Sequence, residues 1–130
     1  MDISNQAIGR AGEFCAASIF EQHGVVTTHV DVHGVDLWCE TPSGRRVTIQ
    51  VKTTMGVSAV YPSDKRAPRY FFQVRGQKAR AADVYCFVAL DSGLLRLLSA
   101  AELPNTQAKA YATDQFTEAA MEADIKRYLY

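Results

Sequence analysis

The stretch Val35–Lys52, V-D-L-W-C-E-T-P-S-G-R-R-V-T-I-Q-V-K, decides the fold of this chain. It predicts a hairpin of two strands, because the T-P-S-G in its middle is typical of a turn. In the second strand apolar and polar residues alternate, so the valines and the isoleucine face one side while Gln50 and Lys52 face the other. The apolar side suits a core. The polar side presents an amide and an ammonium beside the carboxylate of Asp36 in the first strand.

Other segments predict elements that enclose this hairpin. Helical spacing of apolar residues predicts a first helix over about 4–23 and a last helix over about 114–128. The nearly continuous apolar run over 83–90 is typical of a strand covered on both faces. Helices around a meander of strands indicate one α/β or α+β domain spanning 1–130. The remaining expectations are strands at 25–32, 70–75 and 94–98, a loop at 55–69, a polar and basic segment at 76–82, and a helical turn at 99–103.

Composition narrows the class of protein. The 130 residues are 48% hydrophobic and 22% charged, as in ordinary globular proteins. Fourteen basic residues balance fourteen acidic ones, so the overall charge gives no argument for a nucleic-acid partner. Three scattered cysteines without a C-x-x-C pair indicate a reducing compartment and not a zinc site. We expect a cytoplasmic protein with no membrane partner, because the sequence has neither a signal-peptide pattern nor an apolar run of about 20 residues.

The polar side of the hairpin has the composition of a metal site. Asp36 and Glu13, a helix residue among apolar neighbours, supply the carboxylate oxygens that Mg²⁺ prefers. The backbone carbonyl of Val51 would add another oxygen ligand. A divalent ion held there would orient a phosphate and lower the pKa of a bound water, and the Lys52 ammonium would stabilise the developing charge. These residues predict metal-assisted hydrolysis of a phosphodiester.

The order of these motifs, a helix with G-R-A-G-E-F, then G-V-D-L, then I-Q-V-K-T-T, resembles the PD-(D/E)xK nuclease superfamily. It is most similar to the Q-x-K subgroup, with homing endonucleases, Holliday-junction-resolvase-like proteins and VRR-type nucleases. The resemblance covers about 8–98. It implies the restriction-endonuclease-like fold, an α/β three-layer core whose central mixed sheet of about four to five strands is flanked by helices. It also implies Mg²⁺ as cofactor, with Mn²⁺ as a substitute. The implied catalytic residues are Asp36, Gln50, Lys52 and Glu13, and the implied metal ligands are Glu13, Asp36, Gln50 and the Val51 carbonyl.

Gln50 stands where most of the superfamily has an acid, and a neutral amide oxygen is a weaker ligand for Mg²⁺ than a carboxylate. Two hypotheses follow. The chain is a Mg²⁺-dependent endonuclease acting on DNA, in which Glu13 compensates for the amide. Alternatively, it is a catalytically weak or inactive protein of this fold that binds nucleic acid or a protein partner. A core of this size offers little surface for reading sequence, so we expect a homodimer or a targeting partner.

The segment 65–80, K-R-A-P-R-Y-F-F-Q-V-R-G-Q-K-A-R, is rich in basic residues and holds no acidic one. Its cations are expected to contact DNA phosphates, and Tyr70 to stack on a base. The pair Phe71 and Phe72 is more typical of a core strand. The expected nucleic-acid contacts, including those of the hairpin, are Arg45, Arg46, Thr53, Lys65, Arg66, Arg69, Tyr70, Arg75, Lys78 and Arg80.

Overall fold

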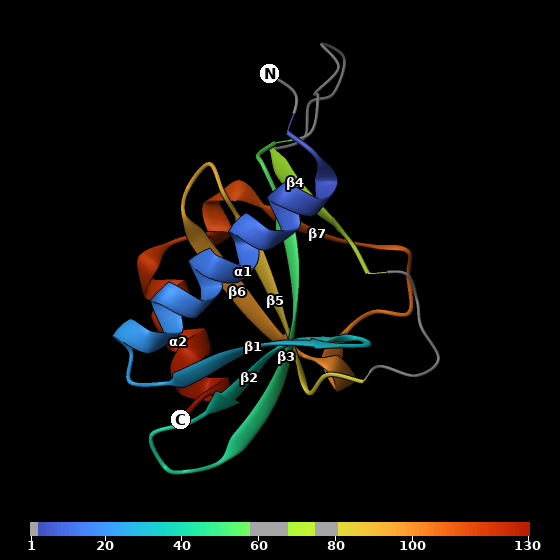
Figure 1. The fold of residues 1–130 in the computed structure, drawn as a ribbon. Helices are drawn as coiled ribbons and strands as arrows, with labels where there is room; N and C mark the ends of the chain where they lie inside the picture. Colours follow the sequence, from blue (N-terminus) through green and yellow to red (C-terminus); the bar gives the residue numbers. More distant parts are fainter. Residues whose placement is uncertain (1–2, 58–67, 75–80) are drawn as a thin grey trace.

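The computed structural model describes residues 3–57, 68–74 and 81–130, and its elements follow the chain from an N-terminal to a C-terminal helix (Figure 1). The predicted hairpin is confirmed as β2 and β3. In chain order the elements are α1 (Asn5–Gln22), β1 (Val26–Val32), β2 (Val35–Glu40), β3 (Arg46–Thr54), β4 (Arg69–Gln73), β5 (Val84–Ala89), β6 (Leu94–Ser99), η1 (Ala100–Glu102), β7 (Ala108–Ala112), η2 (Thr113–Gln115) and α2 (Glu118–Tyr128).

A mixed five-stranded sheet forms the centre of the fold, in the order β1-β2-β3-β5-β6. Strands β3 and β5 pair in parallel from Ile49↔Val84 to Thr54↔Ala89, and the other neighbours pair antiparallel. Every residue of β5 is buried, as its apolar sequence predicts for a central strand. The polar side of β3 is half-buried at Gln50 and Lys52, which places the expected site on the sheet itself.

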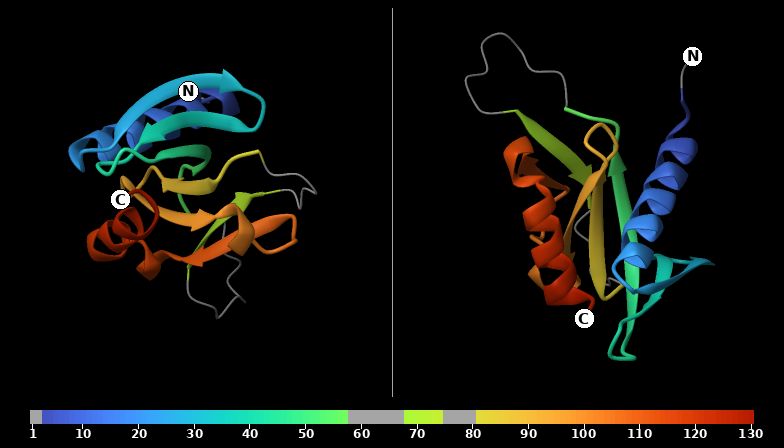
Figure 2. Two further views of the ribbon diagram at one scale, coloured as in Figure 1. Left: turned by 90° about the horizontal axis from the view of Figure 1, so that it is seen from below. Right: turned by 90° about the vertical axis from the view of Figure 1, so that its left-hand side faces the viewer.

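The two faces of the sheet are covered by different layers. Helices α1 and α2 both lie on one face (Figures 1 and 2), where Ala16, Phe20 and Ile125 join one apolar core. The other face is covered by a separate two-stranded sheet of β4 and β7, which encloses an aromatic core around Phe72 and Phe87. The expected three-layer α/β architecture is therefore confirmed, and its third layer is a pair of strands.

Two segments near the C-terminal end differ from the expectation. Residues Ala108–Ala112 form β7, which the sequence did not indicate, and pair along the whole of β4. Helix α2 begins at Glu118 and not near position 114, because the Thr117 side chain accepts a hydrogen bond from Ala120 N–H and caps the helix there. Within the described ranges, neither helix has the length and apolar character needed to cross a membrane.

Candidate functional site

Strands β2 and β3 part at the position of the expected site. Their register stops at Leu37↔Ile49, one pair short of Asp36. The Val51 N–H donates to Oδ2 of Asp36 at 2.8 Å, so a side chain takes the place of a ladder carbonyl. The N–H and C=O of one strand residue point to the same edge. The carbonyl of Val51 therefore faces the gap that holds the Asp36 carboxylate.

The side chain of Gln50 points toward the start of β2. A Cβ built on Gly34 would lie 3.9 Å from Oε1 of Gln50, so this amide oxygen lies beside the turn that leads into Asp36. Gly34 has φ of +77°, a conformation in which glycine avoids the cost of a side chain. Lys52 follows one pleat further along β3, where it pairs with Phe87 of β5. The structure thus brings Asp36, Gln50 and the Val51 backbone together.

Helix α1 is seated on β3 through Gly12. A Cβ on Gly12 would lie 1.8 Å from Oγ1 of Thr53, so the helix approaches the strand more closely than any side chain at this position allows. The Thr53 hydroxyl oxygen is buried and has no hydrogen-bond partner in the part of the chain that the structure describes. The absence of a Cβ at Gly12 therefore fixes how near Glu13 comes to the sheet.

Contacts of three α1 residues also fix the rotation of the helix. Gly12 faces β3, the Phe14 ring lies 4.8 Å from the ring of His29 in β1, and the Cys15 thiol points to the turn between β5 and β6. Successive helical residues are rotated by about 100°. Glu13 therefore lies between the β3 contact and the β1 contact, on the flank of α1 that faces β2. It is half-buried there.

The oxygen donors at this gap fit Mg²⁺. Those that the structure brings together are the Asp36 carboxylate, the Gln50 amide oxygen and the Val51 backbone carbonyl. Within the described residues, no group of three or more His, Cys, Asp and Glu side chains is arranged to hold a metal ion. Mg²⁺ does not require such a group, because proteins bind it through one or two carboxylates while it retains several waters.

Comparison with known proteins shows the fold. No protein-family model and no curated protein matches the chain. Among solved structures, the bacterial homing endonuclease I-Ssp6803I matches with a TM-score of 0.66 and 14% sequence identity, over 92% of this chain and 88% of that chain. This chain has the restriction-endonuclease-like fold. The expected resemblance is thereby confirmed at the level of the fold.

Three of the expected DNA contacts occupy other places in this restriction-endonuclease-like fold. Tyr70 is 4% exposed and its hydroxyl donates to Asp91 at 2.9 Å, so the ring belongs to the core and is not available for base stacking. The Thr53 hydroxyl is enclosed under α1 and is not accessible to a phosphate. The Arg45 guanidinium donates to the carbonyls of Tyr128 and Tyr130 at 3.0 and 3.1 Å, which ties the hairpin turn to the C-terminal end.

Two of the expected cations keep accessible positions. Arg46 is exposed at the start of β3, and the half-buried Arg69 lies over the ring of Phe71 at 5.3 Å. Phe71 is 43% exposed, whereas Phe72 is buried, so the expected pair of core aromatics is divided between solvent and core. The remaining expected contacts lie outside the described residues: Lys65, Arg66, Arg75, Lys78 and Arg80.

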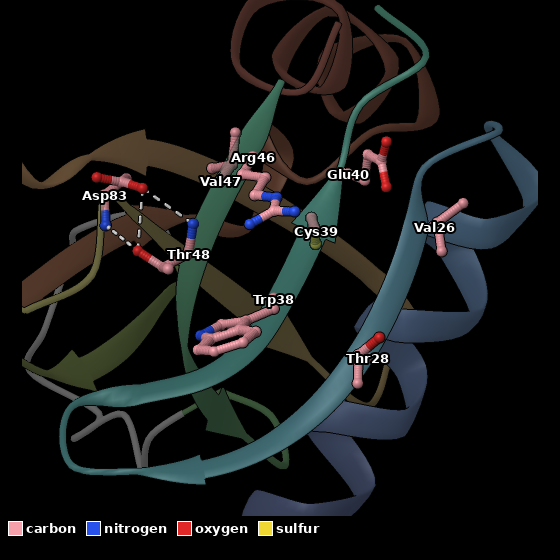
Figure 3. Close-up of a pocket in the computed structure, with 9 residues that line it drawn as sticks. All are labelled: Val26, Thr28, Trp38, Cys39, Glu40, Arg46, Val47, Thr48 and Asp83. Atoms are coloured by element: carbon pink, nitrogen blue, oxygen red, sulfur yellow. Dashed lines mark hydrogen bonds between the residues drawn. The ribbon is translucent and has the colours of Figure 1, made fainter. Parts of the chain in front are cut away.

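A pocket of about 490 Å³ lies on β1, β2 and β3 (Figure 3). The indole of Trp38 is 53% exposed in it, and Arg46 reaches it from β3. Trp38 alternates with the core residues Leu37 and Cys39, a pattern that would have placed it on the exposed side of β2 from the sequence. The lining residues are Val26, Thr28, Trp38, Cys39, Glu40, Arg46, Val47, Thr48 and Asp83.

Proposed function

We propose that this chain is a Mg²⁺-dependent endonuclease that hydrolyses phosphodiester bonds of DNA. The observation that carries the proposal is the hydrogen bond from Val51 N–H to Asp36, which holds a carboxylate in the gap between β2 and β3. One further pair of the β2–β3 register would set Gln50 opposite Asp36, and Lys52 lies two residues further along β3. The match in fold to a homing endonuclease over 92% of the chain supports this chemistry.

The groups of the chain have separate roles. Asp36 and Glu13 hold Mg²⁺, and Gln50 Oε1 and the Val51 carbonyl complete the set of protein ligands. When bound, Mg²⁺ supplies a Lewis acid for the phosphate and lowers the pKa of a bound water. The Lys52 ammonium stabilises the negative charge that develops on the phosphate during attack, an effect whose loss costs about 100-fold or more in rate.

Cleavage assays test the proposal directly. Plasmid, branched and single-stranded DNA are incubated with the protein and Mg²⁺ or Mn²⁺. Asp36→Asn keeps the acceptor for Val51 N–H but removes the charge, so we expect it, like Lys52→Met, to slow cleavage at least about 100-fold. The exposed residues Asp114 and Lys126 provide matched controls as Asp114→Asn and Lys126→Met, with unchanged rates expected. Failure to cut any of these DNAs, or equal rates in all four variants, would contradict the proposal.

The amide at Gln50 favours a second candidate function, a protein of this fold that binds DNA or a protein partner without cutting. Titration calorimetry with Mn²⁺ separates the two. Micromolar or tighter Mn²⁺ binding that Asp36→Asn abolishes supports the endonuclease. Association with DNA without any Mn²⁺ binding supports the second candidate.

We also infer the setting in which this activity operates. The chain acts as a single nuclease domain of 1–130 in the cytoplasm, and it works as a homodimer or with a partner that supplies targeting. A small catalytic core leaves little surface for sequence reading, which is why a second subunit is needed. Sedimentation of the protein alone and with DNA tests this inference, and a monomer that cuts one defined sequence would contradict it.

A further inference from the structure

The pocket on β1, β2 and β3 lies on the face of the sheet to which Gln50 and Lys52 point, because these two residues alternate with Ile49 and Val51 in the core that α1 covers. Register places Thr28, Trp38 and Thr48 in one row across the three strands, and Asp36 lies two residues from Trp38 along β2. At about 3.4 Å per residue the two side chains start about 7 Å apart. Trp38 lies on the face opposite α1, because the alternate residue Leu37 is in the core that α1 covers.

The charges of the pocket disfavour a phosphate as its occupant. Among the described residues that line it, one is a cation, Arg46, and two are carboxylates, Glu40 and Asp83. Arg46 stands opposite Glu40 in the register of β2 and β3. The Asp83 carboxylate accepts from the Thr48 N–H and hydroxyl, both at 3.0 Å, as Figure 3 shows. The pocket therefore offers an aromatic surface and acceptor atoms, among them the Glu40 carboxylate, to a flat neutral group.

We propose that this pocket binds an unstacked DNA base, stacked on Trp38, while the adjoining phosphate lies at the site of Asp36 and Lys52. This inference rests on the proposed endonuclease function and specifies its substrate class as single-stranded, branched or locally opened DNA, since a base inside a duplex cannot reach the pocket. Every base has a face that stacks on an aromatic ring. The Glu40 carboxylate accepts from the exocyclic amine of cytosine, which thymine lacks.

Tryptophan fluorescence reports on the pocket itself, because the chain contains one tryptophan. The Asp36→Asn protein, which preserves the DNA during the measurement, is titrated in EDTA with single-stranded dC and dT oligonucleotides and with a duplex. We expect quenching by single strands, with dC binding more tightly than dT, and little quenching by the duplex. Glu40→Gln is expected to reduce the preference for dC.

Variants are compared by the anisotropy of a labelled dC oligonucleotide. In the same Asp36→Asn background, Trp38→Ala is expected to weaken binding roughly 5- to 150-fold, the range for loss of one stacked base. Trp38→Phe keeps a ring and is expected to weaken it less. Tyr130→Ala removes an aromatic ring that is 49% exposed outside the pocket and is expected to leave affinity unchanged. Circular dichroism confirms that each variant folds.

Several outcomes would overturn the inference. One is DNA binding seen by anisotropy with unchanged Trp38 emission. Another is emission that changes on dilution of the protein alone, which would assign the pocket to a second copy of the chain. Failure of the proposed function is distinguishable: quenching by single strands with no cleavage by the wild-type protein removes the catalytic claim and supports the pocket. Cleavage without any change in Trp38 emission removes the pocket inference and supports the catalytic claim.

Discussion

A methyl group added at Gly12 tests the contact that seats α1 on the sheet. The new Cβ would lie 1.8 Å from Oγ1, 2.7 Å from Cγ2 and 2.8 Å from Cβ of Thr53, all closer than the 3.0 Å that real Cβ atoms keep. Thr53 is short and β-branched, so its rotation cannot relieve all three contacts. The helix or the strand must therefore move, and such overpacking costs about 1–3 kcal/mol.

Helix propensity acts in the opposite direction and provides the control. Alanine in place of glycine inside a helix stabilises by about 0.5–1 kcal/mol. Gly9 lies in the same helix, and a Cβ there would have no atom within 4 Å. Gly12→Ala should therefore lower the free energy of unfolding in urea by about 0.5–2 kcal/mol, while Gly9→Ala raises it by about 0.5–1 kcal/mol. An increase of the same size in both variants would refute the close-approach argument.

The same substitution connects packing to the candidate site. A displaced α1 carries Glu13 away from β2, so Gly12→Ala should also weaken Mn²⁺ binding in calorimetry. Thr53→Ala in the same chain removes the two contacts to Oγ1 and Cγ2 and should restore part of both the stability and the affinity. Unchanged metal affinity in a clearly destabilised Gly12→Ala protein would remove Glu13 from the ligand set.

Three further predictions concern ion pairing, titration and the metal ligands. Asp124 is 13% exposed and accepts from the Arg96 guanidinium at 2.8 Å, so Asp124→Ala should lower the free energy of unfolding by about 2–3 kcal/mol. Arg127→Ala removes an exposed ion pair and should leave the free energy of unfolding unchanged. Equal losses in the two variants would contradict the role of burial. Burial raises the pKa of the Cys39 thiol from 9.0 to about 11. The stabilising contribution of this thiol is therefore complete below pH 9 and is lost as the pH rises through 11. Between pH 8 and pH 10.5, the free energy of unfolding should fall further in the wild-type protein than in Cys39→Ala. Gln50→Glu adds a carboxylate and should tighten Mn²⁺ binding in calorimetry at least about tenfold, and weaker binding would place Gln50 outside the ligand set.

The hairpin could be predicted from the sequence because its determinants are local. Strict alternation over 46–52 and a T-P-S-G turn fix the strands and their faces without reference to the rest of the chain. The burial pattern of β3 follows that alternation. The alternation does not predict that β2 and β3 separate before Asp36. At that point the hydrogen bond from Val51 N–H to Asp36 replaces a backbone pair, whereas the sequence alone predicts that the pairing continues.

The roles of the aromatic and basic residues depended on contacts distant in sequence. Tyr70 lies in a basic run, yet strand alternation puts it on the same side as Phe72, and that side packs on the sheet. Strand β7, with the sequence A-K-A-Y-A, has little β propensity of its own and forms because it pairs with β4 and buries Tyr111. Arg45 binds carbonyls more than 80 positions away, which no local pattern indicates.

A crystal structure of the protein soaked in Mn²⁺ tests the central claim most directly, because the anomalous scattering of the ion locates it without reference to activity. We predict one Mn²⁺ in the gap between β2 and β3, with the Asp36 and Glu13 carboxylates, Gln50 Oε1 and the Val51 carbonyl as its protein ligands. An empty gap at saturating Mn²⁺, or an ion bound elsewhere with Glu13 turned away from β2, would contradict the account.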